Sequence, residues 1–291
     1  MSLLKRIERK LSFQTTKRKL IFVSAVSRII IFLRSLVGKD NEVKAVKRMG
    51  LRWDLDLHEA IDCCLYAFNN YEPELINHMR KNIPSGSIIL DIGANFGVHS
   101  LVLADSIKNS TIYAIEGTDF AFEKLSKNIK LNSHLNNILP EQIYLSSEEK
   151  NTAISVSASW NVKFIQDKKR NKLDGGFAKD ITNAQWLSLD KWIDLKNLDR
   201  VDFIKLDVDG NELDVLMSAQ LTIKRFAPLI YIELSPIHFE KNPLVFDEMI
   251  TLLVGHGYKL KDMFGVELSL DPKKLRKSIP YGSLMNALAY K

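Results

Sequence analysis

Short apolar runs alternate with amphipathic stretches along the chain from residue 71 to its last residue. The runs have the length and the β-branched content of buried strands, and we expect strands at 87–92, 111–115, 142–145, 201–208, 229–234 and 284–290. Helical apolar spacing between them predicts helices at 72–81, 98–107, 119–131, 212–221 and 246–255. This alternation predicts an α/β fold with a doubly wound, mostly parallel sheet and helices on both faces.

The segment from residue 20 to residue 37, LIFVSAVSRIIIFLRSLV, is apolar enough to raise the question of a membrane. Two arginines inside it argue against a span, and no small-residue cleavage site follows, which argues against a secretory signal. On a helix its polar side chains form one stripe, made by Ser24, Ser27, Arg28, Arg34 and Ser35. Two interpretations stay open: residues 17–37 lie on an anionic lipid surface as an interfacial helix, or the helix packs on the body or on a second subunit.

Charge is distributed unevenly along the 291 residues. Residues 1–53 hold 14 Lys and Arg against 3 Asp and Glu, a net of +11, while residues 54–291 hold 27 against 32, a net of −5. We therefore divide the chain into a basic amphipathic helical arm (1–53) and one α/β domain (54–291). The acidic domain argues against nucleic acid as a partner. Because Cys63 and Cys64 are adjacent, we expect two buried thiols and a cytoplasmic protein, with membrane contact through residues 17–37 as the open alternative.

A glycine-rich turn joins the first strand of this domain to its helix. It reads D-I-G-A-N-F-G from Asp91 to Gly97, and Asn95 stands where a D-x-G-x-G-x-G turn has its middle glycine. Asparagine is one of the few residues that tolerate a left-handed backbone, so we expect the turn to be kept. In an open α/β sheet this turn lies at the carboxyl ends of the strands, where ligands bind.

Two carboxylates flank the turn. Asp91 would repel the pyrophosphate of a dinucleotide but suits the ammonium group of S-adenosylmethionine, and Glu116, at the end of the next strand, can accept both hydroxyls of a ribose. The absence of G-x-G-x-x-G also argues against an NAD-linked oxidoreductase. We therefore predict S-adenosylmethionine as the cofactor, bound by Asp91, Gly93, Ala94, Asn95, Gly97 and Glu116.

Several segments of the chain resemble the FkbM family of methyltransferases. They are YEPEL (71–75), ILDIGANFGVHSL (89–101), AIEGT (114–118), the N-x-x-L-N pattern at 128–132, WLSLDKWI (186–193), VDFIKLDVDGNELDVLMSA (201–219) and PLIYIEL (228–234). The resemblance covers about residues 50–260, with Gly117 where proline is usual and Asp209 where glutamate is commoner. The N-terminal arm lies outside it.

The resemblance implies a Rossmann-like class I methyltransferase fold with a seven-stranded sheet. It also implies methyl transfer from S-adenosylmethionine, commonly to a hydroxyl oxygen of a sugar, a glycan or a glycosylated metabolite. Glu72 belongs to the first resembling segment, and two interpretations of it stay open: it lines the cofactor pocket, or it only favours the start of its helix. Fold analogy alone is a weak guide to the acceptor.

Charged residues gather after the fourth strand. Lys205, Asp207 and Asp209 alternate along KLDVD, so a continuous strand would point all three to one side. Because a hydroxyl acceptor needs a base or a charge that favours its alkoxide, we predict Asp207 nearest to the acceptor, with Lys205 and Glu233 beside it. His238 follows in the same rim and joins this catalytic group, although a loop histidine is more often structural.

Other interpretations of these residues stay open. Asp209 and Glu212 can cap the next helix through a D-G-x-E arrangement. Asp207, Asp209 and Glu233 are of the type that binds Mg²⁺, but no metal-binding spacing is present and we predict no metal.

Two other functions also stay open. The same cofactor site would serve an RNA or DNA methyltransferase, whose phosphate contacts would be the basic residues Lys168, Lys169, Arg170 and Lys172. The second is a membrane-associated scaffold that has kept the fold without catalysis. The acidic domain argues against the first function, and the intact turn with its two acids argues against the second.

Overall fold

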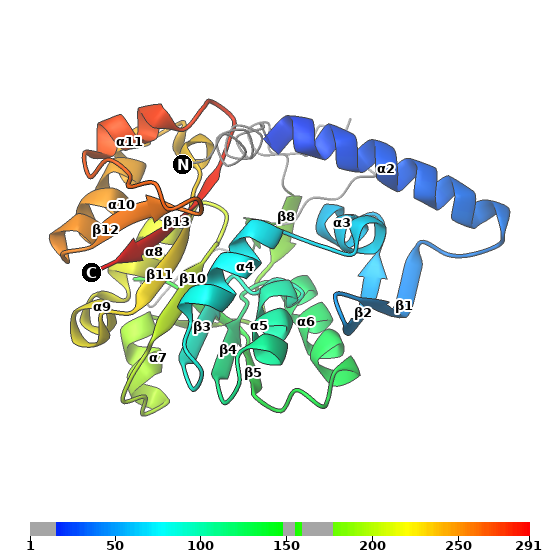
Figure 1. Ribbon diagram of the computed structural model, residues 1–291, viewed down its shortest axis with the longest axis horizontal. Helices are drawn as coiled ribbons and strands as arrows, with labels where there is room; N and C mark the ends of the chain where they lie inside the picture. The colour runs from blue at the N-terminus through cyan, green and yellow to red at the C-terminus, as the bar shows by residue number, and fades with distance from the viewer. Residues whose placement is uncertain (1–15, 148–154, 159–176) are drawn as a thin grey trace.

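A central seven-stranded sheet organises the computed structural model, which describes residues 16–147, 155–158 and 177–291 (Figure 1). In spatial order the strands are β12 (Lys259–Asp262), β13 (Met285–Tyr290), β11 (Leu229–Leu234), β10 (Phe203–Leu206), β3 (Ile88–Ile92), β4 (Thr111–Ile115) and β5 (Ile138–Glu141). The strands from β11 to β5 pair in parallel, whereas β13 runs antiparallel to both of its neighbours. This confirms the prediction of a doubly wound, mostly parallel α/β sheet.

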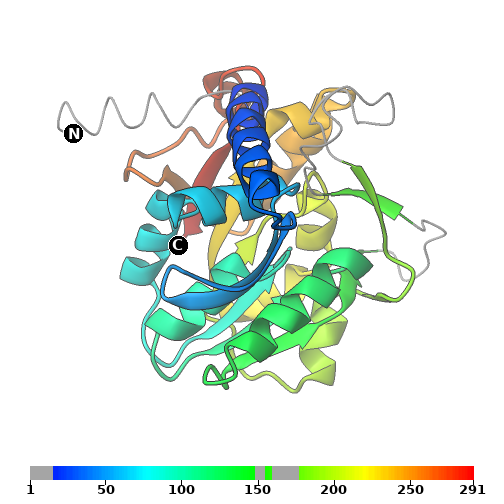
Figure 2. The same cartoon turned by 90° about the vertical axis from the view of Figure 1, so that its right-hand side faces the viewer.

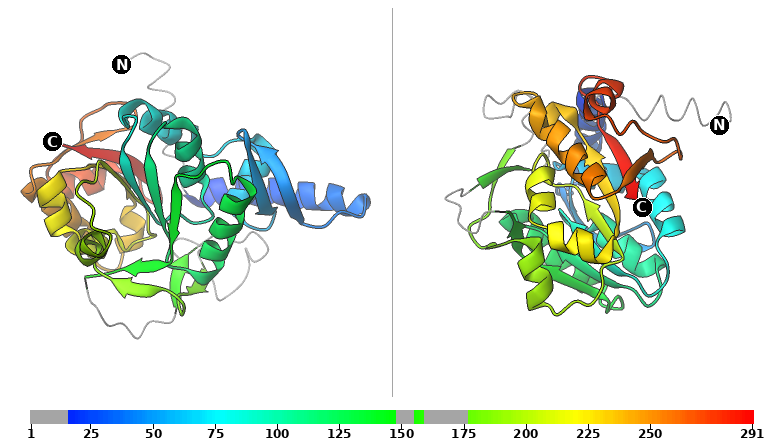
Figure 3. Two further views of the ribbon diagram at one scale, coloured as in Figure 1. Left: turned by 90° about the horizontal axis from the view of Figure 1, so that it is seen from below. Right: turned by 90° about the vertical axis from the view of Figure 1, so that its left-hand side faces the viewer.

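Helices cover both faces of the sheet, because successive side chains alternate between its faces and both sets are apolar. Ile89 and Phe203 belong to one core, whereas their neighbours Leu90 and Ile204 belong to the other. The first core is closed by α4 (Pro73–Asn82), α5 (Val98–Ser106) and α6 (Asp119–Leu131). The second is closed by α7 (Leu189–Leu195), α8 (Glu212–Met217), α9 (Gln220–Phe226), α10 (Pro243–Gly255) and α11 (Pro272–Ser278). The two layers can be followed in Figure 3.

The strand order reverses between β3 and β10. β4 and β5 follow β3 on one side, and β10 and β11 lie on the other. Because β3 and β10 are parallel and Asp91 is paired with Lys205, the carboxyl ends of both strands reach the same edge of the sheet. This edge is where open α/β sheets bind ligands.

Two element boundaries differ from the predictions. The expected helix at 212–221 is broken into α8 and α9, because Asp190 accepts hydrogen bonds from the backbone N–H groups of Leu221 (2.9 Å) and Thr222 (2.7 Å) and so begins a new helix. A strand of the main sheet was expected at 142–145, but the strand in that place is β5, at 138–141. It is followed by β6 (Ile143–Leu145), which pairs with β9 (Gln185–Leu187) outside the main sheet. β5 holds Pro140, which an edge strand tolerates.

Several elements were not predicted: β1 (Glu42–Arg48), β2 (Leu51–Asp56), α3 (Ala60–Phe68), β12 and α11. The last two are short and rich in lysine, and each of them buries few side chains, so no apolar period marks them.

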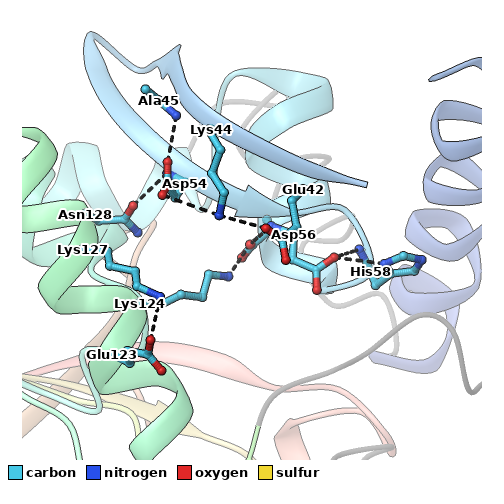
Figure 4. Close-up of polar contacts among 11 residues, drawn as sticks. Glu42, Lys44, Ala45, Asp54, Asp56, His58, Glu123, Lys124, Lys127 and Asn128 are labelled. Atoms are coloured by element: carbon cyan, nitrogen blue, oxygen red, sulfur yellow. Dashed lines mark hydrogen bonds and ion pairs between the residues drawn. The ribbon is translucent and has the colours of Figure 1, made fainter. Parts of the chain in front are cut away.

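The β1–β2 hairpin belongs to the body, so the division at 53/54 falls inside β2. Trp53 is fully buried and packs edge-on against Phe96 at 6.0 Å between ring centroids. The N–H group of Asp54 donates to the side-chain oxygen of Asn128 in α6 at 2.9 Å, as Figure 4 shows. The arm that stands apart in the structure is therefore shorter than residues 1–53.

Helix α2 (Thr16–Leu36) lies along the outside of the molecule against α3 (Figures 1 and 2). Ser24 and Ser27 are buried on its packed side, and the Ser27 hydroxyl donates to the carbonyl oxygen of Leu57 at 2.7 Å. Part of the polar stripe thus faces the body, together with the buried Leu20 and Val23, whereas Arg28 and Ser35 are exposed. This agrees with the packing interpretation. Within the described residues, no helix has the length and apolar character needed to cross a membrane.

Candidate active site

A cavity of about 510 Å³ opens at the carboxyl ends of β3, β4 and β10. Its wall contains the turn after β3, Glu116 after β4 and the segment from Asp207 to Asn211 after β10. Helices α2 and α3 close another part of the wall with Leu20, Val23 and Cys64. The cavity therefore joins the predicted cofactor site to the N-terminal helix.

The turn after β3 needs its glycine at position 93. Gly93 has φ +78°, and a Cβ there would lie 1.8 Å from the backbone oxygen of Asp207. The N–H groups of Gly93 and Ala94 both donate to the carbonyl of Ile115 at 3.0 Å. Asn95 has φ +50°, as expected for its left-handed position. The turn is thus held against both neighbouring strands.

Glu116 fastens this turn to the end of β4. One of its carboxylate oxygens accepts the N–H of Asn95 at 2.8 Å, and the other accepts the N–H and hydroxyl of Thr118 at 2.8 and 2.7 Å. Burial raises the pKa of Glu116, although these hydrogen bonds oppose the rise. Thr118 is the N-cap residue of α6, but its hydroxyl bonds to the Glu116 carboxylate instead of to the helix backbone. Glu116 remains on the cavity wall.

Asp91 lies beneath the cavity wall rather than on it. Its side chain is fully buried, accepts a 2.5 Å hydrogen bond from the Ser100 hydroxyl and lies 3.5 Å from the amine of Lys205. The expectation of direct contact between Asp91 and an ammonium group therefore needs correction. Because β3 and β10 are neighbours in the sheet, Asp91 lies beside Lys205, which does line the cavity.

Lys205 is a buried cation between two carboxylates. Its amine lies 3.2 Å from Asp207 and 3.5 Å from Asp91. Burial alone would lower the pKa of Lys205, but Asp207, Asp91 and Glu72 raise it above its usual value, so the lysine stays protonated. Asp207 is partly exposed to the cavity, with 32% of its side chain accessible. The predicted pair of Lys205 and Asp207 is present.

Glu233 lies on the same wall, near the end of β11. Its side chain is 9% exposed. Burial, together with the carboxylates of Asp207, Asp209, Glu212 and Glu72, raises the pKa of Glu233 well above its usual value. The protonated form of Glu233 is therefore favoured more than that of an ordinary glutamate.

The segment after β10 is a tight turn, not the continuous strand that the alternation along KLDVD required. β10 ends at Leu206, and Asp209 has a left-handed backbone with φ +51°. Glu212 accepts the N–H groups of Val208 and Gly210 at 3.2 and 3.1 Å, so it stabilises the turn. Burial raises the pKa of Glu212 to about 7. Asp209 still lines the cavity.

Glu72 lines the cavity from the start of α4. One of its oxygens lies 3.2 Å from Nε2 of His99, and the other accepts a 3.3 Å hydrogen bond from Asn286. Burial would raise the pKa of Glu72, but His99, Lys205 and Asn286 lower it below its usual value. Glu72 is therefore an anion, and the structure favours the pocket interpretation over a purely helical one.

His238 lies behind the turn after β10. It belongs to the short helix η2 (Pro236–Phe239), and its Cβ is the nearest atom to the position of a Cβ on Gly210, at 3.2 Å. The cavity wall is formed by Gly210, with His238 beyond it. His238 does not itself line the cavity, so the structure gives its place in the catalytic group no support.

Sequence reasoning missed the apolar part of the cavity. Phe120, Ile143 and Tyr144 line it beside Glu116. Gly117, the departure from the usual proline, packs against the Tyr144 ring, which would lie 3.1 Å from an added Cβ. These contacts carry no chemical motif, and they join segments that only the folded sheet brings together.

Two hypotheses from the sequence concern a bound metal ion and a basic segment that would contact nucleic acid. Among the described residues, no set of three or more His, Cys, Asp or Glu side chains is arranged to hold a metal ion. The basic residues at 168–172 lie outside the described residues. They fall between β7 (Ser155–Ala158) and β8 (Phe177–Asp180), which form an antiparallel pair.

Comparison with known proteins gives consistent matches. The family model described as Methyltransferase FkbM domain matches residues 91–260, more than half of the chain. The chain is 30% identical over 196 residues to Methyltransferase sdnD of Sordaria araneosa, which covers 55% of this chain and 74% of that protein. It is 25% identical over 146 residues to Methyltransferase 1 of Beauveria bassiana (strain ARSEF 2860), which covers 46% of this chain and 58% of the relative.

One solved structure with some similarity is the crystal structure of Methyltransferase FkbM from Methylobacillus flagellatus KT. It superposes with a TM-score of 0.45 at 18% identity, over 79% of this chain and 54% of that chain. This chain therefore spans about half the length of that protein.

Proposed function

The chain belongs to the FkbM methyltransferase family, and from that premise we propose that it methylates a hydroxyl oxygen of a sugar, a glycan or a glycosylated metabolite. S-adenosylmethionine is the cofactor. The observation that carries the choice of a hydroxyl acceptor is the pair of Lys205 and Asp207, 3.2 Å apart, with Asp207 open to the cavity.

The residues present fit a cationic nucleoside. The cavity wall carries the carboxylates of Glu72, Glu116, Asp207 and Asp209, a donor set that suits a positively charged ligand. The turn from Gly93 to Gly97 lets backbone approach the ligand closely. These features support the assignment of the turn and the two glutamates as cofactor-binding residues.

Each end of the cofactor has a matching part of the cavity. Glu116 would accept ribose hydroxyls, and the aromatic side chains of Phe120 and Tyr144 beside it offer a surface for the adenine base. Glu72 would meet the ammonium group, because it is an anion on the cavity wall. Asp91 would contribute by positioning Lys205.

The bound cofactor supplies a methyl group that its positively charged sulfur already activates. The residues of the chain then have to orient the acceptor and take its proton. Asp207 would accept the proton of the acceptor hydroxyl, and the protonated amine of Lys205 would stabilise the negative charge that develops on the oxygen. Glu233, on the same wall, would form a hydrogen bond that helps to hold the acceptor.

Labelled methyl transfer tests this proposal. The full chain would be incubated with methyl-labelled S-adenosylmethionine and a panel of glycosides, matched deoxy-glycosides, amines and RNA. We expect label on a glycoside hydroxyl and none on the deoxy compound that lacks it. Label on nitrogen or on RNA would contradict the hydroxyl acceptor.

The substitution Asp207→Asn separates binding from transfer. It removes the proton acceptor but keeps the shape of the side chain, so we expect retained affinity for S-adenosylhomocysteine and at least a hundredfold slower transfer. Asp199→Asn, at an exposed position away from the cavity, is the matched control. Equal loss of cofactor affinity and transfer would place Asp207 in the cofactor site instead.

A further inference from the structure

Helix α2 turns an apolar side away from the protein. Six large apolar side chains of this helix are each more than half exposed: Ile21, Phe22, Ile29, Phe32, Leu33 and Leu36. We refer to them as the apolar face of α2. The Phe22 ring stacks on Phe68, itself 51% exposed, at 6.1 Å between centroids, which extends the face onto α3. An apolar surface of this extent marks an interaction site.

The packed side of α2 differs in composition from its exposed side. The inward side holds both serines and the apolar Leu20 and Val23. Arg34 is also turned to the body, where its Nε donates to the carbonyl of Asp40 at 2.9 Å and its Nη1 to the Tyr66 hydroxyl at 3.3 Å. The helix therefore packs with a mixed side, in which Leu20 and Val23 join the serines, and its exposed side is still apolar. An ordinary surface helix turns a polar side to solvent.

Basic residues accompany the apolar face. Arg18, Lys19 and Arg28 in α2 and Lys39 after it are exposed. Residues 1–53 carry a net charge of +11, against −5 for the rest of the chain. Long basic side chains can keep their charges at lipid headgroups while their methylene stems lie along apolar surface. Apolar and basic side chains on one exposed helix suit an anionic lipid interface.

We propose that the apolar face of α2 docks on the surface of an anionic lipid membrane, with the helix lying parallel to that surface. Phe22, Ile29 and Phe32 enter the boundary between headgroups and acyl chains, and Arg28 meets the lipid phosphates. The opposite side of the same helix contributes Leu20 and Val23 to the active-site cavity. Docking would therefore hold the cavity beside the membrane surface.

A second copy of the chain fits this face less well. A two-fold contact along α2 would bring each residue near the middle of the face to its own counterpart. Arg28 lies near that middle, between Ile21 and Leu36, so two arginines would meet in an apolar contact. A membrane surface with negative headgroups attracts the same arginine.

Vesicle flotation with the full chain tests the proposal. We expect the protein to float with phosphatidylcholine vesicles that contain phosphatidylglycerol, to bind pure phosphatidylcholine at least about tenfold more weakly, and to bind less at raised salt. No flotation with either vesicle, or equal binding to both, would overturn it.

Two substitutions on the apolar face test the role of individual residues in vesicle binding. Ile29→Glu and Phe32→Glu change side chains that are 60% and 61% exposed, so the fold should be kept, and each should weaken vesicle binding by about tenfold or more. Leu221→Glu, at a 67% exposed leucine of α9, is the matched control and should bind as the unaltered chain does. Unchanged binding of both face variants would contradict the proposal.

Charge and self-association complete the test. Arg28→Glu should weaken binding to the anionic vesicles, whereas Lys224→Glu on α9 should not. Sedimentation velocity without vesicles tests whether a second copy of the chain occupies the apolar face instead. If the unaltered chain is a dimer that Phe32→Glu dissociates, and the chain binds no vesicles, the proposal is overturned. The face variants and the unaltered chain should bind S-adenosylhomocysteine with equal affinity in calorimetry. The result of the vesicle experiments then does not depend on the identity of the methyl acceptor.

Discussion

Gly93→Ala is the sharpest perturbation of the cofactor turn, because Gly86 offers a matched control. The two glycines have nearly the same backbone, with φ +78° and φ +79°. A Cβ on Gly93 would lie 1.8 Å from the backbone oxygen of Asp207, whereas the nearest atom to a Cβ on Gly86 is 4.0 Å away. The two variants thus share the cost of a left-handed alanine and differ in the clash.

The size of the effect follows from this difference. A left-handed alanine costs about 1–2 kcal/mol, and we expect that loss in the free energy of unfolding for Gly86→Ala. In Gly93→Ala the two backbones must also separate by at least 3.0 − 1.8 = 1.2 Å, since contacts under 3.0 Å are essentially not seen. Overpacking and the loss of the hydrogen bond from Asp207 to Ile92 bring the expected total to about 3–6 kcal/mol.

Urea denaturation and calorimetry measure both consequences. Gly93→Ala should lose more stability than Gly86→Ala and should also lose affinity for S-adenosylhomocysteine, because its turn is displaced from the cavity. Gly86→Ala should bind as the unaltered chain does. If the two variants lose the same stability and both bind the ligand normally, the close approach of β3 and β10 at Gly93 is refuted.

Two further substitutions test buried polar groups. Glu212→Gln keeps a hydrogen-bond acceptor for the turn after β10 but removes the titratable carboxyl group. Because folding raises the pKa of Glu212 from 4.5 to about 7, the folded state binds that proton more tightly, so its contribution to stability is present below pH 4.5 and is lost as the pH rises to 7. The unaltered chain should lose up to about 3 kcal/mol more than the variant across this window in urea titrations, and parallel curves would contradict the assignment. Asn128→Ala removes the bonds to Asp54 (2.9 Å) and Phe96 (3.0 Å), so it should lower the free energy of unfolding by about 1–3 kcal/mol, and a change below 0.5 kcal/mol would show that α6 does not hold the hairpin.

The strands and the cofactor turn were predictable because local rules agree there with the fold. Continuous apolar runs mark β3 and β11, which are buried on both faces. Asn95 takes the left-handed backbone that its residue type allows. The pairing of Lys205 with Asp207 also follows from strand alternation over two positions.

Other features depend on partners that are distant in the sequence. Asp91 was assigned to the cavity from its place before the glycines, but a lysine on the neighbouring strand covers it. His238 lies against Gly210 in the short helix after β11 and does not line the cavity. The direction of α2 could not be predicted either, since serines and apolar residues share its packed side while other apolar side chains are exposed. Residue periodicity gives the stripe of a helix but not the side that meets the body.

A crystal structure with S-adenosylhomocysteine tests the central claim most directly. The account predicts the nucleoside between the turn at Gly93 and the side chain of Glu116, the ammonium group at Glu72, and the sulfur facing the pair of Lys205 and Asp207. A nucleoside bound elsewhere, or an amino-acid end that points away from Glu72, would contradict it.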